Sequence, residues 1–212
     1  MESSTPPSGA ARPTRDRDLL AWDRSDRIGL SLLLALVAVV SAGAWVVAPI
    51  VDWVGGRDLE VPFFSSVDVP GLAGTGLGHG SADYSLLLPD PSVRQRLLDL
   101  LPGLGYLAIV LVGAWLVLRV MTDIGRGDPF HPRNVRRLRI IGGLLAFGWP
   151  IVFFAELTCR FAILTGLDLG DLGPRAGFTI PVLPVIAGMV VALLAEAFKA
   201  GSRLRRDVEG LV

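Results

Sequence analysis

Four long apolar runs, separated by polar segments, organise this chain of 212 residues. The runs cover residues 28–51, 101–121, 140–164 and 178–198. A helix needs about 20 apolar residues to cross the roughly 30 Å hydrocarbon core of a bilayer, and each run is long enough. The pattern therefore predicts four transmembrane helices. The first run is longer than the apolar core of a signal peptide, which is typically about 7–15 residues, so we read it as an uncleaved anchor.

The polar segment between the first two runs, residues 52–92, has the pattern of a small β-structured cap. Apolar residues alternate with polar ones in two short stretches on either side of a glycine-rich middle, which is strand periodicity: Leu59, Val61 and Phe63, then Tyr84, Leu86 and Leu88. A hairpin this short needs the membrane helices to pack against. We expect two or three strands. Asp90 and Pro91 then signal a helix start, as the N-cap and the first helical residue.

These elements define the predicted fold class, an all-α membrane protein with four transmembrane helices and a small, partly β extracytoplasmic loop domain between helices 1 and 2. Residues 1–17 lack apolar periodicity, and we expect them to be a disordered cytoplasmic terminus. Residues 18–212 form a single four-span domain. It includes a cytoplasmic loop at 122–139 and a cytoplasmic tail at 199–212.

Composition and charge agree with a membrane location and add an orientation. Hydrophobic residues make up 51% of the chain, which is high for a soluble domain. The 20 basic and 20 acidic residues cancel in total but are sorted along the chain. Fifteen Arg and Lys residues fall in the two terminal segments and the central loop, against five on the other side. The positive-inside rule then predicts a multi-pass membrane protein with both termini on the cytoplasmic side.

The central loop is the densest polar stretch between two spans. Gly127 to Phe130 suits a tight turn, and Asn134 is placed to cap the third span. We weigh a rigid structural connector against a docking site for a cytoplasmic partner and against a small-ligand or phosphate site. The candidate residues for any of these roles are Asp123, Asp128, Pro129, Phe130, Asn134, Arg136 and Arg137. A metal site including His131 is disfavoured, because the spacing matches no known ligand pattern.

Two further sets of charged residues lie within the apolar runs. Glu156 and Arg160 are four residues apart in the third span, so their side chains can meet. An ionisable pair inside a membrane is a functional hypothesis, and we weigh a structural ion pair against a proton or ligand role. Glu196 lies near the cytoplasmic end of the fourth span, and we expect it to tether helices through Lys199 or Arg119.

Other residues of the third span concern helix packing. Pro150 lies in the middle of the span and should kink it, with neighbouring helices compensating for the freed carbonyl. A stripe of small residues allows close helix approach: Gly142, Gly143, Ala146 and Gly148.

Two blocks of the sequence resemble the signatures of a known family. The first block comprises Asp123-Ile124, Gly127-Asp128-Pro129-Phe130, and Asn134-Val135-Arg136-Arg137-Leu138-Arg139 with Gly142. The second is the ending Leu194-Ala195-Glu196-Ala197-Phe198-Lys199-Ala200-Gly201, with Leu204, Asp207 and Glu209-Gly210-Leu211-Val212. Both blocks are similar to signatures of the bacterial membrane family catalogued as domain of unknown function 2975. The resemblance covers the chain from about residue 28 to the end. The resemblance implies a four-helix integral membrane protein of no established activity. Genes of this family often lie beside a small helix-turn-helix regulator, which implies a cytoplasmic regulatory partner.

The sequence contains no catalytic, metal or nucleotide signature, so we expect no enzyme activity, cofactor or metal. The single cysteine, Cys159, excludes an intramolecular disulfide. The first function hypothesis is a non-enzymatic signalling, regulatory or partner-docking protein. The second is a small transporter or ion-translocating subunit that uses Glu156 and Arg160. The bilayer and a cytoplasmic regulatory protein are the expected partners. We expect no direct nucleic-acid binding, and self-association stays open.

Overall fold

Four helices of the described residues are long and apolar enough to cross a membrane: Ser25–Val54, Val93–Gly125, Pro132–Leu164 and Val182–Arg203. The computed structural model describes residues 24–65, 82–126, 131–167 and 180–209. The helical spans confirm the four predicted from hydrophobicity. The expected disorder of residues 1–17 and the loop residues Asp128, Pro129 and Phe130 lie outside the described ranges.

The first and third spans are each built from two α-helices joined by a short π-helix. The first consists of α1 (Arg24–Ala42), η1 (Gly43–Val47) and α2 (Ala48–Val54). The third consists of α4 (Pro132–Gly143), η3 (Leu144–Gly148) and α5 (Trp149–Leu164). The second and fourth are the single helices α3 (Val93–Gly125) and α6 (Val182–Glu209).

A proline accounts for each π-helix. Pro49 and Pro150 are each the second residue of the α-helix that follows the π-helix. A proline cannot donate a backbone hydrogen bond, and its ring clashes with the carbonyl four residues earlier. A wider turn relieves this clash. Just before the proline, the N–H of Ala48 donates to the carbonyl of Gly43, and that of Trp149 donates to Leu144. The irregularity expected at Pro150 is therefore a π-helix within the span itself.

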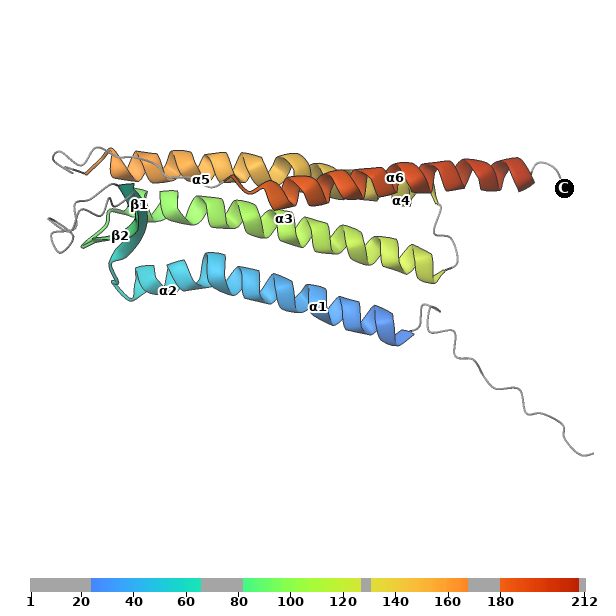
Figure 1. Cartoon of the computed structure of the whole chain (residues 1–212). Coiled ribbons are helices and arrows are strands. Elements are labelled where there is room, and N and C mark those ends of the chain that lie inside the picture. The colour runs from blue at the N-terminus through green and yellow to red at the C-terminus, as the bar shows by residue number, and fades with distance from the viewer. Residues whose placement is uncertain (1–23, 66–81, 127–130, 168–179, 210–212) are drawn as a thin grey trace, which may run out of the picture.

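The spans lie side by side in the order α1, α3, α5, with α6 beside α4 (Figure 1). Among the described residues, the main interhelical contacts are those of α4 with α6, α3 with α5, and α1 with α3. Many large apolar side chains on all four spans are exposed, as lipid-facing side chains of a membrane protein must be. The arrangement is thus a row of helices more than a closed bundle.

Small residues permit a close crossing between the third span and α6. A β-carbon at Gly188 would lie 2.6 Å from the Ala146 nitrogen and 2.7 Å from the Gly142 oxygen. Any side chain there would push the helices apart. This crossing confirms the predicted close approach at Gly142 and Ala146. Gly143 has no atom of another element within 4 Å of its β-position, and Gly148 packs only against side chains.

A β-hairpin covers one end of α3 and α5 (Figure 1). Strands β1 (Leu59–Ser65) and β2 (Ala82–Leu88) pair antiparallel, with Leu59 opposite Leu88. The buried cluster beneath them joins three hairpin residues to two from the end of α5: Leu59, Val61, Leu88, Ile163 and Leu164. This hairpin is the two-stranded form of the predicted cap. We call this side of the molecule the hairpin end, and the opposite side, between α3 and α4, the basic end.

Two predicted helix caps were wrong. The N-cap of α3 is Ser92, two residues after the predicted Asp90. Ser92 forms a capping box with Gln95. Asp90 instead adopts a left-handed backbone conformation with φ of 50°. The N-cap of α4 is His131, because Pro132 is pre-set for the first helical turn. The predicted capping residue Asn134 lies inside the helix.

Candidate functional site

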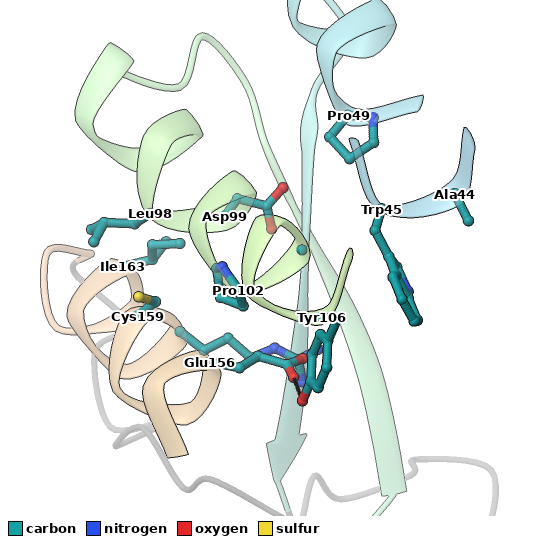
Figure 2. Close-up of a pocket in the computed structure, with 12 residues that line it drawn as sticks. Ala44, Trp45, Pro49, Leu98, Asp99, Pro102, Tyr106, Glu156, Cys159 and Ile163 are labelled. Atoms are coloured by element: carbon teal, nitrogen blue, oxygen red, sulfur yellow. Dashed lines mark hydrogen bonds and ion pairs between the residues drawn. The ribbon is translucent and has the colours of Figure 1, made fainter. Parts of the chain in front are cut away.

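Polar and aromatic side chains line a pocket at the hairpin end. The pocket has a volume of about 250 Å³. Three spans supply its walls, with Trp45 on one side, Glu156 and Cys159 on the other, and α3 between them (Figure 2). It therefore lies where the first, second and third spans meet.

One face of α3 supplies the centre of the pocket. Asp99, Pro102, Gly103 and Tyr106 all line it. They follow the spacing i, i+3, i+4 and i+7, which places side chains on one helix face. Gly103 also allows the first span to come close, because a β-carbon there would lie only 2.4 Å from the Trp45 carbonyl oxygen.

Glu156 connects the second and third spans. Its carboxylate accepts a hydrogen bond of 2.8 Å from the Tyr106 hydroxyl and forms an ion pair with Arg160 one turn further along α5. The expected i,i+4 contact is therefore present. Charged hydrogen bonds away from bulk water are stronger than neutral ones. The Tyr106 contact fixes Glu156 as part of the pocket wall.

Asp99 has a different environment from Glu156. Among the described residues it makes no hydrogen bond or direct salt bridge, although Arg160 and Arg96 are near enough to act on it electrostatically. Arg96 is 7% exposed and donates to the carbonyl of Arg57, while its Nε has no hydrogen-bond partner. Both oxygens of the Asp99 carboxylate therefore have no hydrogen-bond donor among the described residues.

Three aromatic rings pack together beside these charges, and two of them, those of Trp45 and Tyr106, line the pocket. The ring centroids of Trp45 and Tyr106 are 5.4 Å apart, and those of Tyr106 and Trp149 are 4.8 Å apart. Trp45 and Trp149 meet edge to face at 6.2 Å. Aromatic faces next to carboxylates favour cations with an apolar part. Sequence patterns did not single out Trp45, Asp99 or Tyr106, although the seven-residue spacing of Asp99 and Tyr106 indicates a shared helix face.

At the basic end, Arg137 holds α3 and α4 together. Its guanidinium lies 2.5 Å from the Asp123 carboxylate and also donates to the side-chain oxygen of Asn134 and the carbonyl of Arg119. Asn134 is completely buried. We call Asp123, Asn134 and Arg137 the latch. Arg136, the other candidate from this helix, is exposed.

Glu196 forms its ion pair between helices with a residue other than the expected Arg119. Glu196 pairs with Arg139 of α4 and with Lys199 of its own helix. Arg119 instead lies over the ring of Trp115, with 5.4 Å between its guanidinium carbon and the ring centroid. The expectation of an ion pair with Lys199 holds, whereas Arg139 supplies the connection between spans.

The described part of the chain contains no group of three His, Cys, Asp or Glu side chains that could hold a metal ion. Cys159 is a buried free thiol in the pocket wall. A buried thiol of this kind packs as a small apolar residue.

The comparison with protein families identifies the chain. The family model described as Protein of unknown function (DUF2975) matches residues 57–211. The chain therefore belongs to this family, as its two signature blocks indicate. The match begins after the first span, later than the residue 28 expected from the resemblance. No curated protein and no solved structure matches the chain.

Proposed function

We propose that this member of the DUF2975 family is a non-enzymatic signalling protein of the bacterial cytoplasmic membrane. It binds a small molecule bearing an ammonium group in the pocket at the hairpin end, and it passes this signal to a cytoplasmic regulatory protein at the basic end. The observation that carries the proposal is the pocket itself, in which charged and aromatic side chains from three spans converge.

The ligand class follows from the chemistry of the wall. Two carboxylates, Asp99 and Glu156, line the pocket against one guanidinium, that of Arg160. Glu156 is already engaged by Tyr106 and Arg160, which leaves Asp99 to pair with a ligand. Trp45 and Tyr106 provide aromatic faces for a cationic head and its apolar substituent.

The helix α3 supports transmission between the two ends. It runs without interruption from Asp99 in the pocket to Asp123 in the latch. At about 1.5 Å per residue, this distance is roughly 36 Å. A shift of α3 against α5 at the pocket would change the geometry of the Asp123–Arg137 contact, because the two residues lie on different spans.

The charge bias of the sequence supports a cytoplasmic position for the basic end. Arg136 is the candidate for partner docking, because it is exposed while Arg137 is held in the latch. Crosslinking in cells, followed by mass spectrometry, should recover a regulatory protein with the wild type. Recovery should be lost with Arg136→Glu but kept with Arg203→Glu, an equal charge reversal at an exposed position of α6.

Ligand binding is tested on the full-length protein in lipid nanodiscs by tryptophan fluorescence. The probe is n-butylammonium, and n-butanol is the neutral control of the same chain length. We expect a saturable change with the ammonium probe alone. Asp99→Asn should weaken it about tenfold or more, as expected for loss of a charged contact. Asp90→Asn is the matched control, because Asp90 is exposed and asparagine tolerates its left-handed backbone. Equal responses of the two variants would refute this ligand site.

A second candidate function is proton or ion translocation through Glu156. The observation in its favour is that the polar pocket reaches this intramembrane carboxylate, which Tyr106 and Arg160 hold in place. The test is proton flux into proteoliposomes carrying a pH-sensitive dye. A flux that the wild type supports and Glu156→Gln abolishes would favour translocation over signalling. Equal proton flux in empty vesicles and in vesicles that contain the wild type would exclude translocation.

A further inference from the structure

The basic end contains a second pocket, of about 310 Å³, whose wall is dominated by arginine. It is lined by Arg119, Asp123, Arg126, His131, Arg133 and Arg137. These residues come from the end of α3 and the start of α4, so two spans and the turn before α4 build the wall. The pocket shares Asp123 and Arg137 with the latch, and it lies at the opposite end of α3 from Asp99.

The described wall carries an excess of positive charge. Four guanidinium groups line the pocket together with a single carboxylate, that of Asp123. Arg137 already forms an ion pair with this carboxylate at 2.5 Å. Arg126 is 4.0 Å from the same carboxylate and is 76% exposed. Arg133 has no side-chain ion pair among the described residues. Like charges this close repel one another, so an anion between them would stabilise the arrangement.

The surroundings keep two of these four guanidinium groups in position. The ring of Trp115 lies under Arg119, and Arg137 is fixed by three acceptors. The N-terminus of α4 lies at the same pocket, and its backbone dipole adds a further partial positive charge. Guanidinium groups present paired donors that match two oxygens of a phosphate.

We infer that this pocket binds a phosphate group, with Arg119, Arg126 and Arg133 as its ligands and Arg137 as the link to the latch. Phosphate is favoured over a carboxylate, because three guanidinium groups can share its several oxygens and its greater negative charge. Its source is either the headgroup of an anionic phospholipid or a free phosphate compound, since the pocket lies where α3 leaves its apolar span.

The experiment uses the full chain purified into nanodiscs. In one arm the discs contain only phosphatidylcholine, and inorganic phosphate is titrated at constant ionic strength while thermal stability is recorded. In the other arm the discs contain phosphatidylcholine and phosphatidylglycerol, and retained lipid is counted by native mass spectrometry. Each arm compares wild type with Arg133→Gln and with Arg203→Gln, which removes one charge from an exposed position outside the pocket.

Binding in either arm that Arg133→Gln weakens about tenfold, and Arg203→Gln leaves unchanged, supports the inference. Stabilisation by inorganic phosphate identifies a free phosphate compound as the ligand. Selective retention of phosphatidylglycerol without a phosphate effect identifies a lipid headgroup. Equal behaviour of the two variants, or no binding in either arm, overturns the inference. Both variants leave Asp99 and the hairpin-end pocket intact, so this outcome is independent of ammonium binding.

Discussion

At the scale of single residues, two polar connections join α3 to the third span in the described part of the chain, one near each end. Near the hairpin end, the Tyr106 hydroxyl donates to Glu156 across the boundary between α3 and α5. At the basic end, Arg137 of α4 reaches Asp123 of α3. Both connections involve α3, which makes this helix the element through which one end can influence the other.

The Tyr106 contact should contribute measurably to stability. Tyr106→Phe removes only the hydroxyl and leaves a Glu156 oxygen without its donor, so we expect a loss of about 1–3 kcal/mol. Unfolding in mixed micelles with increasing denaturing detergent measures the change. Thr158→Val is the control, because the Thr158 hydroxyl bonds only within its own helix, to the carbonyl of Phe154. Equal stabilities of Tyr106→Phe and the wild type would show that the hydrogen bond is not formed in the membrane.

The Asp123–Arg137 ion pair of the latch should have a larger coupling energy than the Asp123–Arg126 pair. A double-mutant cycle of Asp123→Asn and Arg137→Gln should give about 1–2 kcal/mol, because both side chains are mostly shielded, at 21% and 19% exposure. The same cycle with Arg126→Gln should give less than about 0.5 kcal/mol, since that pair is longer and open to water. Detergent unfolding supplies the energies. Equal coupling in the two cycles would contradict the assignment of Arg137 to the latch.

At the scale of elements, the crossing of the third span with α6 depends on the absence of a side chain. Gly188→Ala would force its β-carbon against backbone atoms of Gly142 and Ala146, which cannot move independently. We expect destabilisation of about 1–3 kcal/mol in detergent unfolding. Gly113→Ala is the matched control on α3, where nothing lies within 4 Å. It should be neutral or stabilise by up to about 1 kcal/mol, as alanine favours helix. Similar effects of both substitutions would argue against the close crossing.

The four spans and the two strands could largely be predicted from the sequence. Hydrophobic runs located the four spans, and alternation at Leu59 and Val61 and at Leu86 and Leu88 located the two strands. The helix caps were less accessible, because Ser92 and His131 compete with nearby residues of similar capping chemistry. The π-helices were missed, since a proline marks an irregularity without specifying how the helix accommodates it.

The pocket could be predicted only in part. Glu156 and Arg160 were found from their spacing on one helix, which is a local property. Trp45 and Asp99 join them through the packing of η1 on α3 and of α3 on α5. Hydrophobic periodicity does not specify which helices are neighbours. The interhelical partner of Glu196 was misjudged for the same reason: α6 packs against α4, so Glu196 meets Arg139 and not Arg119.

At the scale of the whole molecule, the account requires the two ends to face opposite sides of the membrane. In a Cys159→Ala background, a single cysteine at Glu60 on β1 should react with a membrane-impermeant maleimide added to intact cells. A cysteine at Arg203 should react only after the cells are opened. Both positions are exposed, so accessibility depends on sidedness alone. The reverse pattern would invert the proposed orientation.

The central claim is that occupancy of the pocket at the hairpin end changes the basic end. Spin labels at cysteines replacing Ile28 and Arg203, in the Cys159→Ala background, report the distance between the basic-end portions of α1 and α6, and both sites are exposed. Pulsed electron paramagnetic resonance in nanodiscs then measures this distance with and without saturating n-butylammonium. We predict a shifted distance distribution that Asp99→Asn abolishes. An unchanged distribution, under conditions where tryptophan fluorescence shows the probe bound, would contradict a signalling role for the pocket.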